Sequence, residues 1–96
     1  MSAYVIVEIA IHNPELYEDY KRMSTASLQE FGGEFVVRGG ETITLEGDWN
    51  PERIVVLKFS NVEQAKSWWN SSIYSEARSI RQQAAFTKML IVEGVN

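Results

Sequence analysis

Arg38 has the chemistry and the surroundings of a residue that binds an anion. It ends a short apolar stretch and is followed by Gly39 and Gly40, where the absence of side chains lets a ligand approach the backbone closely. A guanidinium can bind a carboxylate through two parallel hydrogen bonds. The alternative is an ion pair with Glu46 across the predicted turn, and the sequence leaves both roles equally open.

Arg53 is a second candidate for the same chemistry. It follows the loop that contains Asp48 and Trp49 and opens an apolar segment, so Arg53 and Trp49 are placed to close the mouth of a pocket. An ion pair with Asp48 or Glu52 is the simpler interpretation, and an exposed pair of this kind contributes under about 1 kcal/mol. The sequence favours the ion pair, while Arg53 and Trp49 stay among the candidate ligand-binding residues.

Five aromatic side chains fall in segments that we expect to be helical, and core packing is the commoner role of aromatic residues at that spacing. Trp68 and Trp69 cannot both point inward, because successive residues in a helix are about 100° apart. One of them is expected to lie at the edge of the core or to line a cavity. The hydroxyls of Tyr20 and Tyr74 are candidate hydrogen-bond donors to a ligand, with Tyr17 beside them.

Two other polar residues are weaker candidates for a functional role. Glu8 interrupts an apolar segment, where pairing with Lys58 or Lys88 is favoured over service as a general base with a raised pKa. His12 is the only histidine and there is no cysteine, so we expect no metal site and no tightly held cofactor. No nucleophile triad, phosphate loop or dinucleotide fingerprint is visible.

Length and composition indicate one domain over residues 1–96. The chain has 45% hydrophobic residues, which is too many for disorder. Its net charge is −4 and it has no run of basic residues, so neither nucleic acid nor an anionic membrane surface is an expected partner. It contains no apolar run of about 20 residues and no signal-peptide pattern, and a cytoplasmic location is expected by default.

The hydrophobic patterns predict strands separated by helices. Asn13 is a good N-cap for the first helix, and Gly32 and Gly33 end it. Asn61 is placed to cap the second helix. The expected elements are strand 3–11, helix 14–31, strand 35–38, strand 42–46 after a Gly-Gly turn, strand 53–59, a helix from Asn61, helix 73–84 and strand 86–92.

This order contains two β-α-β halves and predicts a ferredoxin-like α+β fold, with an antiparallel sheet covered by helices on one side. Strands 3–11, 53–59 and 86–92 are apolar on both faces, so the uncovered face would expose a large apolar patch. Burying that face against a second copy removes the exposure. The sequence therefore predicts a homodimer that forms through the sheet.

Eight short segments distributed over nearly the whole chain carry a family resemblance. They are residues 4–7, 13–20, 31–33, 37–40, 45–49, 51–53, 68–71 and 92–95. Together they resemble a widespread bacterial family described only as a domain of unknown function, within the dimeric α+β barrel superfamily. The resemblance implies a ferredoxin-like protomer, a dimer whose two sheets close into a barrel, and no settled activity. Other members of that superfamily include cofactor-free monooxygenases, haem-degrading enzymes and small isomerases.

We therefore expect a homodimer that binds a small anionic or aromatic molecule between sheet and helices. Whether it is an enzyme stays open, and the superfamily suggests isomerisation or cofactor-independent oxygenation as the chemistry. The alternative is a non-catalytic binding or assembly module with a filled core. The candidate ligand-binding residues are Tyr20, Arg38, Trp49, Arg53, Trp68, Trp69 and Tyr74.

Overall fold

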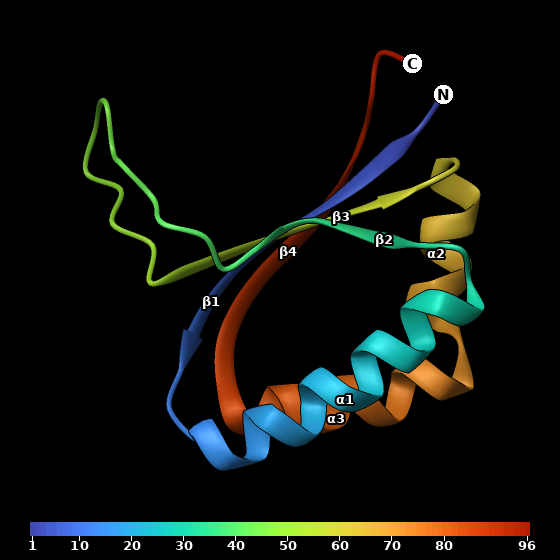
Figure 1. Cartoon of the computed structure of the whole chain (residues 1–96), viewed down its shortest axis with the longest axis horizontal. Helices are drawn as coiled ribbons and strands as arrows, with labels where there is room; N and C mark the ends of the chain where they lie inside the picture. Colours follow the sequence, from blue (N-terminus) through green and yellow to red (C-terminus); the bar gives the residue numbers. More distant parts are fainter.

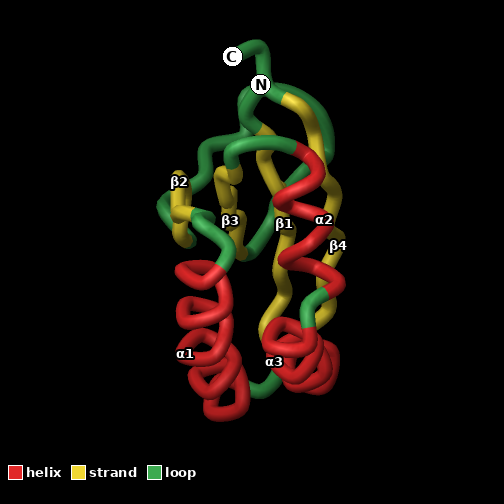
Figure 2. Tube along the Cα trace, turned by 90° about the vertical axis from the view of Figure 1, so that its right-hand side faces the viewer, coloured by secondary structure: helices red, strands yellow, loops and turns green.

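The protein is described by a computed structural model of residues 1–96. Its elements are β1 (Ala3–Ile11), α1 (Pro14–Glu30), β2 (Glu34–Arg38), β3 (Arg53–Phe59), α2 (Val62–Asn70), α3 (Ser72–Ala84) and β4 (Ala85–Glu93). The strands form one antiparallel sheet in the order β2-β3-β1-β4. All three helices lie on one side of it, with α1 and α3 next to each other (Figures 1 and 2). The predicted ferredoxin-like α+β fold is confirmed. None of the helices is both long and apolar enough to cross a bilayer.

The ends of α1 are determined by local chemistry that the sequence shows. The Asn13 side chain accepts a hydrogen bond from the Leu16 N–H at 3.2 Å, and Pro14 occupies the first helical position. At the other end Gly32 has a φ of 70°, and the Gly33 N–H donates to the Leu28 carbonyl at 2.9 Å. This is the Schellman arrangement, which satisfies the last carbonyls of the helix and turns the chain into β2.

The core lies between the sheet and the helices. Alternate residues of β1 (Val5, Val7 and Ile9) point to the helices and are at most 3% exposed. Trp68 and Tyr74 pack against this layer from the helices, and both are at most 1% exposed. We call this side of the sheet the helix face and the other side the open face.

A bulge in β2 decides which face of the sheet Arg38 occupies. Arg38 pairs with Val55 of β3 after the register shifts between Phe35 and Val37. Because Val55 points to the helices, Arg38 does so too. Without the extra residue Arg38 would stand opposite Ile54 and point to the open face, since a slip of one residue reverses every side chain.

The predicted strand at residues 42–46 is wrong. The chain between β2 and β3 forms no regular structure and projects from the body as a long loop, which we call the arm (residues 39–52; Figure 1). β2 pairs directly with β3, so the alternating side chains of residues 42–46 meet no partner strand. Ile43 and Leu45 are 76% and 94% exposed. The ion pair between Arg38 and Glu46, one of the two roles left open for Arg38, is absent.

The open face carries exposed apolar side chains in the molecule as it stands. Ile6 lies between Val56 of β3 and Leu90 of β4, and the exposed fractions of Ile6 and Leu90 are 37% and 56%. Phe86 and Val92 extend the patch along β4 at 74% and 43%. This exposure is what the sequence predicts for a sheet whose second face lacks a covering layer.

Candidate functional site

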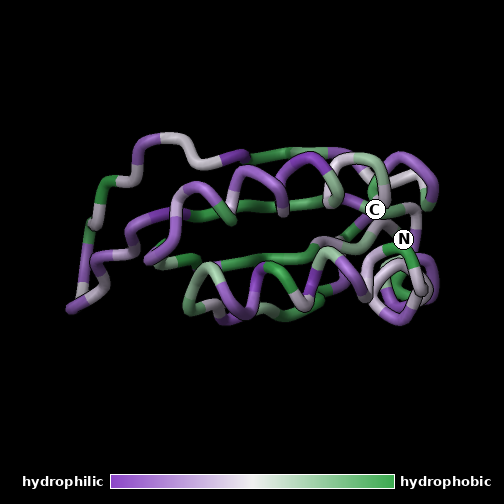
Figure 3. The backbone as a smooth tube through the Cα atoms, turned by 90° about the horizontal axis from the view of Figure 1, so that it is seen from below, coloured by the Kyte–Doolittle hydropathy of each residue, from purple (hydrophilic) through white to green (hydrophobic).

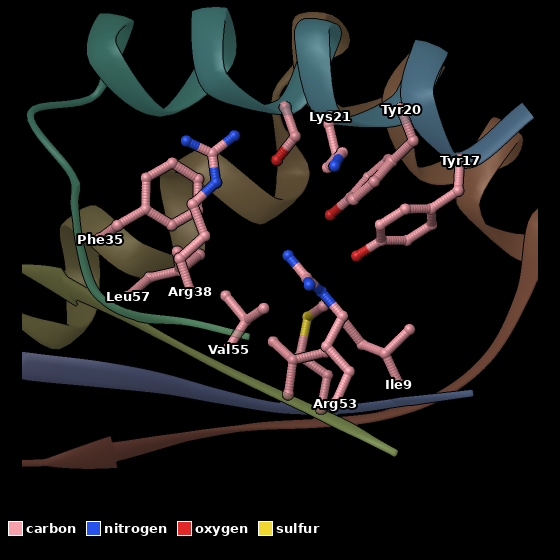
Figure 4. A pocket seen from close by; sticks show the side chains of 12 residues that line it. Ile9, Tyr17, Tyr20, Lys21, Phe35, Arg38, Arg53, Val55 and Leu57 are labelled. Atoms are coloured by element: carbon pink, nitrogen blue, oxygen red, sulfur yellow. The ribbon is translucent and has the colours of Figure 1, made fainter. Parts of the chain in front are cut away.

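A narrow cleft lies between α1 and the end of the sheet nearest the arm (Figure 4). It has about 410 Å³ of empty space when its open mouth is counted, but only about 30 Å³ of it is wide enough for the centre of a water molecule. The lining residues are Val7, Ile9, Tyr17, Tyr20, Lys21, Ser24, Phe35, Arg38, Arg53, Val55, Leu57 and Met89. Three of them are cations and none is an acid or a histidine.

Lys21 and Arg38 provide the outer part of this positive lining. Lys21 is one-third exposed and pairs with Glu18 on the outer surface of α1 at 3.0 Å. Arg38 is exposed, lies over the Phe35 ring at 4.2 Å, and donates to the Thr25 hydroxyl at 3.3 Å. Neither side chain is locked by a buried partner, so both can move to admit or cover a ligand.

Arg53 lies deeper and has no acidic partner. Neither Asp48 nor Glu52 pairs with it, contrary to the favoured interpretation of the sequence. Its Nε is buried without a hydrogen-bond partner, and its guanidinium lies 5.9 Å from the centre of the Tyr17 ring. A side chain at Gly39 would collide with this guanidinium, so the glycine leaves the space that Arg53 occupies.

Two tyrosines form the opposite wall, and both stay protonated at neutral pH. Burial raises the pKa of Tyr17 above its usual value, as does Tyr20, while the positive charges of Arg53 and Arg81 act in the other direction. Burial also raises the pKa of Tyr20 far above its usual value, with Tyr74 as the next contribution. The tyrosines can therefore donate hydrogen bonds but cannot act as bases.

Tyr20 and Tyr74 bring their hydroxyls together in the core, 3.0 Å apart. We expect Tyr20→Phe to lower the free energy of unfolding by about 1–3 kcal/mol, because the hydroxyl of the fully buried Tyr74 loses its partner. The double variant Tyr20→Phe/Tyr74→Phe should cost less than the sum of the two single variants. Urea unfolding of the four proteins at one protein concentration measures this coupling.

The outcome that contradicts this pairing is strict additivity. If the two losses simply add, each hydroxyl has an independent partner and the pair contributes no coupling energy. Tyr4→Phe is a control, since Tyr4 lies on the open face, is only half-buried and makes no side-chain hydrogen bond.

Arg81 is a buried cation that the sequence reasoning missed. Arg81 of α3 is 2% exposed, while its apolar neighbour Ile80 is only partly buried. Arg81 donates to the Thr87 hydroxyl and lies 6.0 Å from the Trp69 ring centre, and its Nε has no partner. Its position in the last turn of α3, where the helix dipole favours a cation, was the available signal.

Trp68 and Trp69 lie away from the cleft. They line a separate hollow between α2 and β4, in which about 280 Å³ is wide enough for the centre of a water molecule, and all of its lining residues are apolar. Trp68 is 1% exposed and donates its indole N–H to the Ser27 hydroxyl at 3.1 Å, whereas Trp69 is half-buried. The expectation that one tryptophan sits at the edge of the core therefore fits Trp69. Met89 borders both this hollow and the cleft.

Trp49 lies on the arm and outside the cleft. It is 59% exposed, and its indole N–H donates to the Glu8 carboxylate on the open face at 2.7 Å. Glu8 stands opposite Lys88 in the register but forms no ion pair with it or with Lys58. Of the seven candidate residues, the structure gathers Tyr20, Arg38 and Arg53 around the cleft, with Tyr74 directly behind Tyr20.

Comparison with known proteins agrees with the fold. Residues 2–95 match the profile of DUF1330, described as a domain of unknown function. No curated protein matches the sequence significantly. The resemblance to an uncharacterised family of ferredoxin-like proteins is thus confirmed.

Solved structures share this architecture at low sequence identity. A protein of unknown function from Rhodopseudomonas palustris is 18% identical, with a TM-score of 0.79 over 99% of this chain and 83% of that one. A dimeric ferredoxin-like protein of unknown function from Jannaschia is 12% identical, with a TM-score of 0.75 over 98% and 100% of the two chains. SnoaB, a cofactor-independent oxygenase from Streptomyces nogalater, is 10% identical, with a TM-score of 0.67 over 99% and 94%. At these identities the likeness shows the fold alone.

Proposed function

Since this chain belongs to the DUF1330 family, whose description assigns no activity, we propose its function from its own cleft: it binds a small organic anion between sheet and helices, as a homodimer. The observation that carries this proposal is the lining of the cleft. Three cations face it and no acid does, in a chain with a net charge of −4.

The charge of Arg53, which has no counter-ion in the protomer, favours the binding of an anion in the cleft. A guanidinium stays charged at any physiological pH, and a partly buried one without a counter-ion is costly. A carboxylate at this place would satisfy the free Nε and accept from the Tyr17 hydroxyl as well. The nearby buried charge of Arg81 adds to the positive potential.

The rest of the lining suits the body of such a ligand. Phe35, Val55, Leu57 and Met89 provide an apolar wall next to the cations. The space of about 30 Å³ holds little more than a water molecule, so a ligand requires the mouth to open. Arg38 and Lys21 are the side chains free to move. An aromatic or aliphatic carboxylate of modest size fits this combination of charge and apolar surface.

A catalytic role is the second candidate, and the cleft restricts its chemistry. The lining has no group that accepts a proton at neutral pH, so one protomer does not by itself provide the base that an isomerase needs. It does provide cations and hydroxyls that stabilise a substrate already present as an anion. The resemblance in fold to a cofactor-independent oxygenase agrees with this second role. A non-catalytic binding module requires only that the cleft binds the anion.

The homodimer is proposed from the open face. Its apolar side chains are exposed in one protomer, and a related structure of the same fold is described as dimeric. Packing two open faces together removes this apolar area from water at roughly 25 cal/mol per Å². That contribution matters for a domain of this size, whose own stability is only about 5–15 kcal/mol.

Native mass spectrometry of the freshly purified protein tests both parts of the proposal. We expect a dimer that carries added mass, lost on mild acidification as a carboxylate ligand is protonated. A bare dimer that also fails to bind added benzoate would count against the anion site and favour the assembly module. A monomer at micromolar concentration would contradict the dimer.

A further inference from the structure

The arm, residues 39–52, makes few hydrogen bonds and few packing contacts within its own protomer. Figures 1 and 3 show it projecting beyond the sheet and the helices. Apart from Gly39 N–H to the Ile54 carbonyl, its backbone makes no hydrogen bond with the body, and within the arm Thr44 donates to the Trp49 carbonyl. Three large apolar side chains, Ile43, Leu45 and Trp49, are 59–94% exposed on it. The side chains add one bond to the body, from the Trp49 indole N–H to the Glu8 carboxylate, so few contacts oppose the entropic cost of ordering the arm.

The arm also carries the whole net charge of the chain. It contains four acidic residues and no basic one: Glu41, Glu46, Asp48 and Glu52. The rest of the chain has nine acidic and nine basic residues. Two arms would repel each other, so a surface that binds the arm must combine apolar contacts with positive charge.

The open face places two lysines beside an apolar centre and is continuous with the arm. The inner side of the arm and Ile54 enclose a largely apolar hollow of about 360 Å³. The face itself carries the basic residues Lys58 and Lys88 around the apolar centre at Ile6. Together with Glu8 and Glu34, these lysines make the sheet face electrically balanced. A face that carries both charges around an apolar centre can pair with a second copy of itself, because the lysines of one copy can meet the acidic groups of the other.

We propose that the arm of each protomer clasps a second copy of this chain, with Leu45 and Ile43 buried against the partner and the arm's acidic groups near the open-face lysines of the other copy. This proposal rests on the homodimer of the proposed function and assigns the arm a role in it. In a symmetric dimer the arm of each copy is buried against the other copy. Each arm thereby gains the contacts that it lacks in the protomer.

The clasp also ties the dimer to the cleft. The arm starts at Gly39 and ends at Glu52, directly before Arg53. Gly39 packs against the Arg53 guanidinium, and its N–H is bonded to Ile54. Fixing the arm on a partner therefore fixes the backbone on both sides of the innermost cation of the cleft. The anion site is complete only when the second copy holds the arm in place.

Sedimentation velocity over a range of protein concentrations tests the clasp through Leu45→Asp. We expect the dimer dissociation constant to rise at least about 100-fold, because each of two arms loses an apolar contact and gains an unpaired charge. Ile73→Asp is the matched control, since Ile73 is an exposed isoleucine at the start of α3 on the helical side. This control should dissociate as the wild type does. Leu45→Ala, with an expected rise of about tenfold or more, removes the contact without adding a charge.

Tryptophan emission gives an independent readout. The difference spectrum between the wild type and Trp49→Phe should shift to the blue as dimer forms, because the part of Trp49 that is exposed in the protomer becomes buried in the interface. If the wild type dimerises but Leu45→Asp and Leu45→Ala leave the dissociation constant unchanged, the clasp is refuted while the dimer stands. If the wild type is a monomer, the homodimer and the clasp both fail. Benzoate binding that persists at full strength in a monomeric Leu45→Asp variant would refute the link to the cleft.

Discussion

Replacing Arg53 by methionine is expected to weaken the binding of a small carboxylate by about 10- to 100-fold, the worth of one hydrogen-bonded charge. Methionine keeps the unbranched apolar stem and removes only the guanidinium. Benzoate serves as a minimal probe, because it combines a carboxylate with an aromatic ring. Titration followed by NMR shifts of the wild type and the variant measures the two dissociation constants.

The same substitution should leave the free energy of unfolding unchanged or raise it. Arg53 has no acidic partner and a buried Nε without a hydrogen bond, so methionine removes a desolvation cost and no ion pair. Loss of binding without loss of stability is characteristic of a ligand-binding residue. A residue that only supports the fold shows the reverse.

Two further variants make this test specific. Arg53→Lys keeps the charge but loses the planar pair of donors, and an intermediate affinity is expected. Arg22→Met is the matched control, since Arg22 lies exposed on α1 and pairs with Asp19 away from the cleft. Unchanged benzoate binding in Arg53→Met, together with a clear loss of stability, would make Arg53 a structural residue and move the anion elsewhere.

The parts of this architecture that depend on local chemistry could be predicted from the sequence. Asn13 and the two glycines after α1 fix that helix because capping involves only neighbouring residues. The strands were recognisable because long runs of β-branched residues have few alternatives. For Arg53 the sequence offered a pocket mouth but favoured an ion pair with Asp48 or Glu52, and the structure contains no such pair.

The parts that depend on distant partners could not be predicted. Residues 42–46 alternate as a strand does, but alternation does not show whether another strand lies alongside. Arg38 points to the cleft only because of a bulge in β2, and no residue pattern in β2 predicts that bulge. Arg81 is buried although charged, and its neighbour Ile80 was the better guess by hydrophobicity alone. In each case the missing information is the tertiary surroundings.

Replacing Trp68 by alanine should have the largest effect on stability of any single change discussed. Its ring packs on Tyr74 and Phe59, with ring centres 4.0 and 5.4 Å away, and its indole N–H donates to the buried Ser27 hydroxyl. Truncating a fully buried tryptophan costs about 3–5 kcal/mol, partly through the cavity that remains. A domain with about 5–15 kcal/mol in total loses a large share of its stability.

Trp69→Ala is the control that separates the two adjacent residues. Trp69 is half-buried and contacts the Arg78 guanidinium, which lies 4.6 Å from its ring centre and donates to its carbonyl at 3.0 Å. Its truncation removes less buried surface, and a loss of about 1–2 kcal/mol is expected. Urea unfolding at one fixed protein concentration measures both variants, because dissociation of a dimer contributes to the apparent stability.

The comparison also decides where a ligand can stack. If Trp68→Ala unfolds far more readily than Trp69→Ala, Trp68 is a core residue, and the apolar hollow beside it is bounded by a wall that cannot move aside. A ligand in the hollow is then limited to its present space of about 280 Å³, whereas the cations that hold an anion lie only in the cleft. If instead Trp68→Ala is as stable as Trp69→Ala, the ring is not needed to hold α2 on the sheet. The hollow next to Met89 could then widen beyond its present size and accept a larger aromatic ligand.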